Sequence, residues 1–331
     1  MNSIEISWLK EFAKSWLDRI EQNRLPHAVL LAGPIGTGKR AAATWMAARH
    51  LEISPTTVLP QFPVTSLAHA DLRWITPAED KQAIGIDQIR ELVADMSLTS
   101  YAGGGKVAVI EPANAMTTNA ANSLLKTLEE PSGDALLILI ADRTGRLPAT
   151  IFSRCQRIEF APPGAAASLV WLDRLRPGSS WAEALALARN APLAALTTID
   201  QLDTHTSMSR DFADVAAGRS AAIEVAARWA RLDAVFVLGW MAQQVRQLIC
   251  VASGVALEPF AHGIDESVLR RMDRRNLFCY LDIINRLRGQ PGGSYNVLLT
   301  LEGLLIDLAE GLAFCGRNPL GDAMTHVLLK R

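Results

Sequence analysis

The chain has 331 residues, of which 49% are hydrophobic and 20% are charged, as expected of a globular protein with two or three domains. Lysine and arginine total 33 against 34 aspartate and glutamate, so no large positive field draws the protein as a whole onto nucleic acid. Any contact with DNA must therefore be local or shared with partner proteins.

The cysteines and the apolar stretches predict a cytoplasmic protein. The four cysteines have no metal-ligand spacing, which is typical of reduced thiols; they are Cys155, Cys250, Cys279 and Cys315. Glu5, Lys10 and Glu11 stand where an export signal needs an apolar run. The most apolar region lies between Asp233 and Arg246 and is shorter than a bilayer span requires, so we expect no contact with a membrane.

Strand and helix patterns alternate over the first 160 residues. Apolar runs typical of strands occur at 27–33, 72–76, 106–112, 135–142 and 155–160. Helical spacing occurs at 6–23, 41–51, 86–98 and 118–131. The runs at 106–112 and 135–142 are continuous, as in strands covered on both faces, and the alternation predicts an α/β module with a parallel sheet.

The segment APPGAAA, residues 161–167, indicates the first domain boundary, and no strand pattern returns beyond it. We expect an α/β module at 1–162 and a small helical domain at 163–205. Residues 206–331 follow as an all-α domain of longer helices.

Residues Gly33 to Arg40 read GPIGTGKR, which fits the phosphate-binding loop G-x-x-x-x-G-K-[ST] except at its last position. In such loops, backbone N–H groups at a helix N-terminus surround the phosphates, and glycines permit the close approach. The candidate phosphate contacts are Gly33, Gly36, Thr37, Gly38 and Lys39. The order of apolar run, glycine loop and helix favours this interpretation over an ordinary glycine turn.

Two departures affect metal-assisted hydrolysis. The hydroxyl that ends the loop normally binds Mg²⁺, and Arg40 cannot replace it. The strand pattern KVAVIEP ends in Glu111 followed by Pro112, where a second carboxylate would complete the metal site. We therefore expect little or no ATPase activity from this chain. Binding of ATP or ADP to the degenerate loop, with Glu111 beside it, stays open.

A third pattern carries a resemblance to a known family. NAANSLLKTLEEP is followed about twenty residues later by LPATIFSRCQRIEF, and RLPHAVLLAGPIGTGKR precedes both. This combination resembles the clamp-loader branch of the AAA+ ATPases, which includes the gamma/tau and delta-prime subunits of bacterial DNA polymerase III. The resemblance covers residues 1–160 well, and the helical remainder agrees in size and class.

The resemblance implies the roles of several parts. The helical domains at 163–205 and 206–331 would be a lid and an oligomerisation collar. Arg154 of the SRC motif would act as an arginine finger in the ATP site of a neighbouring subunit, because a guanidinium is permanently charged and forks onto phosphate oxygens. From the residues alone, a structural role, in which Arg154 caps a helix or pairs with a carboxylate, is the favoured interpretation.

Three departures favour the non-motor delta-prime type. They are Arg40, the Glu111–Pro112 pair, and NAPLAAL at 190–196, where a motor subunit would carry a nucleotide-sensing arginine. The implied partners are the gamma/tau and delta subunits, the sliding clamp and, through the complex, primed DNA. The chain would thus be a component of a DNA-directed DNA polymerase holoenzyme, a nucleotidyltransferase complex.

The sequence also departs from the best-known members of the family. They carry a four-cysteine zinc module after the first helix of the domain, whereas residues 51–75 contain no cysteine. Either the module is lost or the segment SPTTVLPQFPVTS, residues 54–66, replaces it. We therefore expect no zinc.

The remaining polar candidates favour structural roles. The six histidines form no recognised metal-binding motif. The segment LRRMDRRN, residues 269–276, could touch DNA or an acidic partner, but a solvated helix face is the simpler interpretation. Cys155 has no histidine placed near it in sequence, which favours packing over nucleophilic chemistry.

Two alternative functions remain open. The chain could be an active motor ATPase that tolerates Arg40 and uses Glu111 for the metal. It could also be a scaffold in which Arg154 is purely structural.

Overall fold

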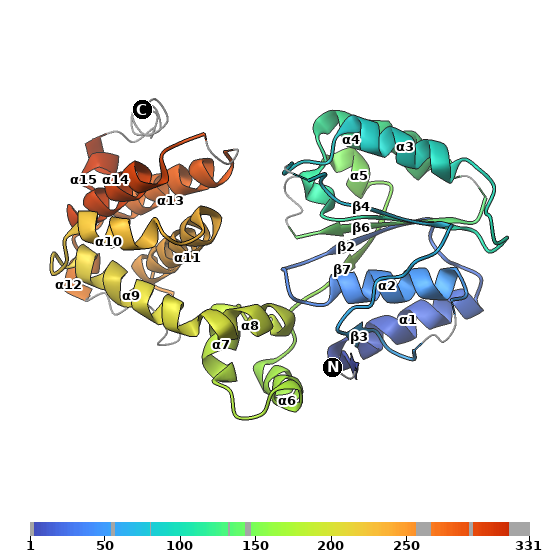
Figure 1. Cartoon of the computed structure of the whole chain (residues 1–331), viewed down its shortest axis with the longest axis horizontal. Helices are drawn as coiled ribbons and strands as arrows, with labels where there is room; N and C mark the ends of the chain where they lie inside the picture. Colours follow the sequence, from blue (N-terminus) through green and yellow to red (C-terminus); the bar gives the residue numbers. More distant parts are fainter. Residues whose placement is uncertain are drawn as a thin grey trace. The chain divides into compact units, whose positions relative to one another are not determined.

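The computed structural model describes residues 3–53, 57–79, 81–131, 133–142, 147–255, 266–290 and 294–317. The chain divides into two compact units, Met1–Asp200 and Gln201–Arg331. The first unit contains a β-sheet, and the described elements of the second are helices (Figure 1).

The first unit is built on a five-stranded parallel sheet with strand order β4-β5-β6-β2-β7. Its strands are β2 (Ala28–Ala32), β4 (Leu72–Ile75), β5 (Lys106–Ile110), β6 (Ala135–Ala141) and β7 (Gln156–Glu159). All residues of β2, β5 and β6 are buried, because these strands occupy the middle of the sheet and are covered on both faces. Each strand coincides with an apolar run in the sequence.

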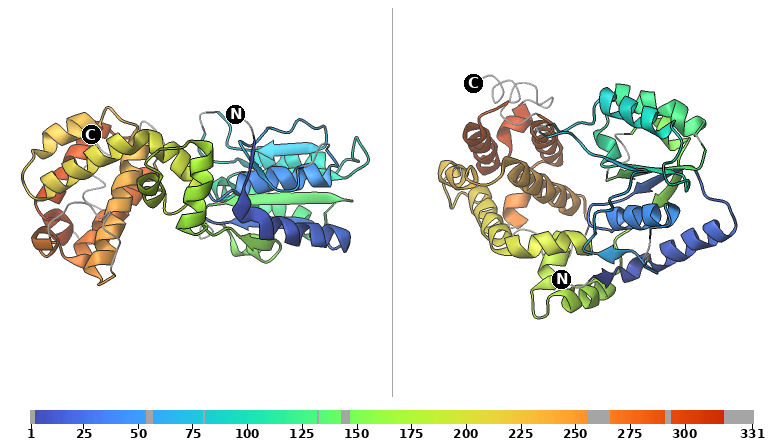
Figure 2. Two further views of the ribbon diagram at one scale, coloured as in Figure 1. Left: turned by 90° about the horizontal axis from the view of Figure 1, so that it is seen from below. Right: turned by 45° about the vertical axis from the view of Figure 1, so that its right-hand side comes forward.

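Helices cover both faces of this sheet. They are α1 (Lys10–Glu21), α2 (Lys39–His50), α3 (Ile86–Met96), α4 (Thr118–Glu129) and the single turn α5 (Ala149–Phe152). Helices α3, α4 and α5 lie on one face, and α1 and α2 lie on the other (Figures 1 and 2). Every second residue of β2, including Leu30, packs with Ile89 of α3 and Leu124 of α4 in one buried core.

The N-terminal segment adds a short antiparallel pair that the sequence patterns do not indicate. β1 (Ile4–Glu5) pairs with β3 (Gln61–Phe62), and a 3-10 turn (Ser7–Leu9) precedes α1. β3 belongs to the segment 54–66, of which the structure describes 57–66. The Thr57 carbonyl in this segment accepts hydrogen bonds from Trp45 and Arg49 of α2 at 2.8 and 2.7 Å. The segment therefore packs along α2.

Three short helices complete the first unit: α6 (Ala165–Leu175), α7 (Trp181–Leu187) and α8 (Pro192–Thr198). Trp171 of α6 is buried, and its indole N–H donates to the Glu5 carbonyl at 2.8 Å. Residues 163–200 of the segment expected to be a lid, 163–205, belong to the same compact unit as the sheet, and the division between the units falls after Asp200. Its role as a lid stays a prediction.

The regular elements that the structure describes in the second unit are all helices. It contains α9 (Leu202–Ala216), α10 (Ala222–Trp229), α11 (Ala234–Ala252), α12 (Glu266–Leu269), α13 (Arg274–Arg288), α14 (Val297–Ala309) and α15 (Ala313–Arg317), which enclose one apolar core. Trp240 of α11 lies edge-on to Phe212 and Trp229, with ring centroids 5.7 and 5.5 Å away. The predicted fold class, a parallel α/β module followed by helical regions, is confirmed.

Among the described residues, α11 alone is long and apolar enough to cross a membrane, with a mean hydropathy of 1.3 in its most apolar window. Half of that window is buried inside the protein. The buried side chains include Trp240, Met241 and Val245, which lie in the core of the second unit. This burial is that of a core helix.

Candidate functional site

The phosphate-binding loop connects β2 to α2 at the carboxyl edge of the sheet, the edge at which α/β folds bind ligands. Gly33 and Gly36 have φ values of +149° and +84°, which side-chain-bearing residues rarely adopt. A Cβ atom at Gly33 would lie 2.1 Å from the Phe160 carbonyl oxygen. Gly38, also left-handed, directly precedes the first residue of α2. The strand, loop and helix thus follow one another as the sequence predicts.

Lys39 fills the inside of the loop. Its side chain is 5% exposed, and its ammonium group donates to the carbonyls of Gly33 and Pro34 at 2.7 and 2.6 Å. It also forms an ion pair of 2.8 Å with Asp142, just beyond β6. An ammonium group has three N–H donors, so the chain itself occupies all three. A phosphate group entering this loop would have to displace at least one of these contacts.

Thr37 forms hydrogen bonds within the loop and with the N-terminal segment. Its side chain is buried, and its hydroxyl donates to the Pro34 carbonyl at 2.9 Å. Its own carbonyl accepts a hydrogen bond of 2.9 Å from the indole N–H of Trp8. The Trp8 bond ties the loop to the N-terminal segment.

Arg40 points away from the loop interior, toward the end of β5. Its side chain is 61% exposed, its guanidinium lies 5.3 Å from the Trp74 ring centroid, and its Nε is 3.4 Å from the Glu111 carboxylate. Trp74 donates its indole N–H to the same carboxylate oxygen at 3.1 Å. Burial raises the pKa of Glu111, and the neighbouring Arg40 opposes that rise. Where a motor subunit would hold Mg²⁺ between a hydroxyl and two acids, this chain has a guanidinium, one carboxylate and Pro112.

A cavity of about 380 Å³ lies between the loop and α8. Leu193 and Ala194 of α8 line it together with Lys39 and Glu111. The Leu193 backbone N–H donates to the Gly36 carbonyl at 3.1 Å, so the start of α8 is bonded directly to the loop. The segment expected at the place of a sensor arginine therefore reaches the loop, but it brings apolar side chains and no cation.

Arg154 lies at the other edge of the sheet. It precedes β7, and the first residue of β7, Gln156, is in register with Val29 near the start of β2. The phosphate-binding loop begins after Ala32, which is in register with Glu159 at the end of β7. At roughly 3.3 Å per residue, the length of a strand separates Arg154 from the loop of its own chain. The structure brings Glu111 and the loop together, and it keeps Arg154 apart from them.

The Arg154 guanidinium is held by residues of its own chain. Its Nε donates to Glu129 Oε1 at 2.7 Å, and its Nη2 forms an ion pair with the same oxygen. Its Nη1 donates to the Thr150 carbonyl and to the Ser153 hydroxyl, both at 3.1 Å. The side chain is nevertheless 31% exposed, so it can be reached from outside the unit. Glu129 is the first glutamate of TLEEP, and sequence reasoning did not connect it to Arg154.

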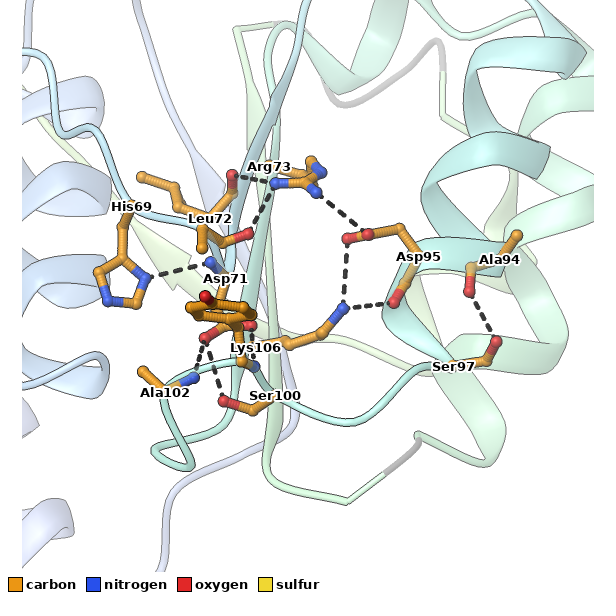
Figure 3. Close-up of polar contacts among 12 residues, drawn as sticks. His69, Asp71, Leu72, Arg73, Ala94, Asp95, Ser97, Ser100, Ala102 and Lys106 are labelled. Atoms are coloured by element: carbon orange, nitrogen blue, oxygen red, sulfur yellow. Dashed lines mark hydrogen bonds and ion pairs between the residues drawn. The ribbon is translucent and has the colours of Figure 1, made fainter.

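A separate polar cluster lies beside the edge strand β4 (Figure 3). The Asp71 carboxylate accepts hydrogen bonds from the backbone N–H groups of Tyr101 and Ala102 at 2.7 and 2.9 Å, and these bonds lower its pKa. Lys106 at the start of β5 pairs with Asp95 of α3 at 3.5 Å. These contacts attach the loop between α3 and β5 to the sheet, which is a structural role.

The remaining sequence candidates lie apart from the phosphate-binding loop. Burial raises the pKa of Cys155 to about 12, which keeps its thiol protonated and fits a packing role. Within the described parts of the chain, no three His, Cys, Asp or Glu side chains are grouped to hold a metal ion. His262 and His326 lie outside the described residues. The predicted absence of zinc stays a prediction.

The segment 269–276 reads LRRMDRRN, and its arginines are exposed. Met272 is buried in the core of the second unit, and the Asp273 side chain accepts the Arg275 N–H at the start of α13. The exposure fits a solvated helix face, and a contact with DNA or an acidic partner stays open.

Comparison with known proteins supports the resemblance that the motifs indicate. Residues 8–164 match the family model described as DNA polymerase III, delta subunit. The DNA polymerase III subunit delta' of Pseudomonas aeruginosa is 44% identical over 178 residues, which is 51% of this chain and 54% of that protein. Its counterpart in Escherichia coli is 37% identical over 130 residues, 39% of each chain. Over about half of its length, this chain is therefore similar in sequence to a delta-prime subunit of DNA polymerase III.

The match has a defined extent. The chain spans about half the length of the Pseudomonas delta-prime subunit and less of the Escherichia one. A solved structure from Thermotoga maritima, a DNA polymerase III gamma subunit-related protein, covers 93% of this chain and 100% of its own, with a TM-score of 0.50 and 18% identity. At that identity the likeness supports the fold alone. The family-model match at residues 8–164 covers the α/β module, which contains the phosphate-binding loop and Arg154.

Proposed function

We propose that this chain is the delta-prime subunit of a DNA polymerase III clamp-loader complex. In this role it is a stator that helps to load the sliding clamp onto primed DNA, while neighbouring subunits hydrolyse ATP. Arg154 acts as an arginine finger in the ATP site of one neighbour. The observation that carries the proposal is the position of Arg154, partly exposed at the sheet edge opposite its own phosphate-binding loop.

This geometry fits action in trans. A guanidinium that completed the ATP site of its own chain would have to lie at the carboxyl edge of the sheet, beside Lys39. Arg154 lies at the amino edge, where only another molecule can bring a phosphate group to it. The homology of the same module to delta-prime subunits supports a neighbour of the clamp-loader type.

The contacts in the phosphate-binding loop support the proposal that this chain does not hydrolyse ATP efficiently. Lys39 is fully occupied by its own chain, and Arg40 stands in place of the hydroxyl that binds Mg²⁺. Glu111 is paired with Arg40 and Trp74 rather than left open to a metal ion. ATP turnover in the complex would then belong to the other subunits.

The partners in this proposal are the gamma/tau and delta subunits, the sliding clamp and primed DNA held by the complex. Residues 163–205 would form the lid and residues 206–331 the collar that joins the subunits, and the protein would work in the cytoplasm. The balanced charge of the chain agrees with DNA contact through an assembly rather than through this chain alone.

The test is reconstitution with and without this chain. Purified gamma/tau and delta subunits are mixed with the sliding clamp and primed DNA, and clamp loading is measured by retention of labelled clamp on the DNA. We expect loading to require this chain and the chain to elute with the other subunits in size-exclusion chromatography. Full loading in its absence would contradict the proposal.

One observation favours the alternative function, that of an active motor ATPase. The loop keeps Gly33, Gly36 and Lys39, and a cavity of about 380 Å³ with Glu111 in its wall lies beside it. A motor would show Mg²⁺-dependent ATP turnover by the isolated chain, abolished by Lys39→Ala. We expect no such turnover.

A further inference from the structure

We propose that Glu129 is the positioning residue of Arg154, holding the guanidinium in the orientation that presents it to a neighbouring subunit. This inference rests on the proposed function. Glu129 is the last residue of α4, and Arg154 lies just after the end of α5. The ends of these two helices therefore bring together two residues that are 25 positions apart in the sequence.

The contacts differ in strength along the two edges of the guanidinium. Glu129 Oε1 accepts from both Nε and Nη2, which is a charge-assisted contact on one edge. The contacts of Nη1 go to two neutral oxygens, those of Thr150 and Ser153, and are longer at 3.1 Å. A phosphate oxygen can displace a neutral acceptor from Nη1 much more readily than it can displace the carboxylate.

The N–H groups of Arg154 that do not contact Glu129 lie on the side of the guanidinium that could bind a phosphate. A guanidinium has five N–H groups, and the contacts of Arg154 with residues that the structure describes use four of them, which leaves one N–H of Nη2 without a partner among those residues. That N–H group and the adjacent Nη1 form the fork that can grip a phosphate, while the Nε edge stays on Glu129. The carboxylate thus fixes the side chain, and a phosphate can use the fork by displacing only a neutral acceptor from Nη1.

Holding the Arg154 side chain in one orientation matters because this side chain is partly exposed. Both partners keep solvent access, with exposed fractions of 31% for Arg154 and 49% for Glu129. An unrestrained arginine samples many rotamers, and ordering it at the moment of reaction reduces the transition-state stabilisation that it provides. Glu129 orders it beforehand, so its removal should lower turnover rather than assembly.

The experiment measures the clamp- and primed-DNA-stimulated ATPase rate of the reconstituted complex. Five variants of this chain are compared with the wild type: Glu129→Gln, Glu129→Asp, Arg154→Ala, the Glu129→Gln/Arg154→Ala double variant, and Glu159→Gln as a matched control. The control removes the carboxylate of another exposed pair on the same module, Arg157 with Glu159. Assembly is checked by size-exclusion chromatography and folding of each chain by urea denaturation.

We expect Glu129→Gln to lower kcat by roughly fivefold with little change in the KM for ATP, and Arg154→Ala to lower it by about tenfold or more. The double variant should be no slower than Arg154→Ala alone, because Glu129 acts only through the arginine. Glu129→Asp should restore part of the loss, and Glu159→Gln should match the wild type.

Three results would overturn the inference. If Arg154→Ala is slow while Glu129→Gln keeps the wild-type rate, Arg154 acts without Glu129 and the proposed function stands. If Glu129→Gln slows the Arg154→Ala complex by a further fivefold, Glu129 acts elsewhere. If Arg154→Ala itself keeps the wild-type rate in an assembled complex, the finger role fails together with the positioning role.

Discussion

Lys39 of the phosphate-binding loop and Asp142 at the end of β6 form an ion pair of 2.8 Å in which the lysine is almost fully buried. The lysine that would bind phosphate in an active loop is here a structural cation. This relationship connects the fold to the proposed non-motor role, because the lysine is already paired with a carboxylate of its own chain.

We predict that Lys39→Met destabilises the protein by about 2 kcal/mol, because it leaves the Asp142 carboxylate without its partner. The free energy of unfolding from urea titrations measures this cost. Asp142→Asn should lower the free energy of unfolding less in the Lys39→Met variant than in the wild type. Additive effects of the two substitutions would show that the pair contributes nothing.

The contact between the loop and α8 gives a second prediction. A Cβ atom at Gly36 would lie 2.4 Å from the Ala194 backbone nitrogen, whereas at Gly103 nothing lies within 4 Å. Both glycines have φ near +80°, so Gly103→Ala is a matched control for backbone strain. We expect Gly103→Ala to lower the free energy of unfolding by about 1 kcal/mol and Gly36→Ala to lower it by at least about 1 kcal/mol more. Equal costs in urea denaturation would mean that α8 is not packed on the loop.

The raised pKa of Glu111 predicts a pH dependence. Its ordinary value is 4.5, and burial makes the folded protein hold this proton more tightly than the unfolded chain does. The contribution of Glu111 to stability therefore falls as pH rises from about 4.5 through the folded-state pKa. Glu111→Gln removes this dependence while its amide oxygen can still accept from Trp74.

The unfolding free energies of Glu111→Gln and the wild type, measured between pH 4 and pH 7, test this sign. We expect the variant to gain stability relative to the wild type as pH rises. A constant difference across this range would contradict a raised pKa at Glu111.

Asp71 should show the opposite pH dependence. The N–H groups of Tyr101 and Ala102 lower its pKa below the ordinary value of 3.8, so its contribution is complete above that value and is lost as pH falls through the folded-state pKa. We predict that Asp71→Asn is less stable than the wild type at pH 7 and that the gap narrows below pH 3.8. Thermal unfolding at a series of pH values measures the difference in stability between the variant and the wild type. A difference that grows in acid would contradict a lowered pKa at Asp71.

Much of the fold could be predicted from the sequence because its signals are local. The continuous apolar runs of β5 and β6 reflect burial on both faces, and the glycines of the loop reflect backbone conformations that other residues rarely adopt. The short pair of β1 with β3 could not be predicted, because two-residue strands carry no periodicity.

The site was predictable only in part. The loop residues and Glu111 were indicated by spacing, and their proximity follows from neighbouring parallel strands. The partners Asp142, Trp74 and Glu129 were missed, because they meet the loop, Glu111 and Arg154 only after folding. Asp142 had one available signal, since it directly follows a fully apolar run and so had to lie at the same sheet edge as the loop.

The central claim is that Arg154 works on a neighbour's ATP. The most direct measurement is the clamp- and primed-DNA-stimulated ATPase rate of a complex reconstituted with gamma/tau and delta subunits, comparing wild type with Arg154→Ala. We predict a fall of about tenfold or more with assembly unchanged. An unchanged rate in an intact complex would contradict the claim and leave this chain as a scaffold.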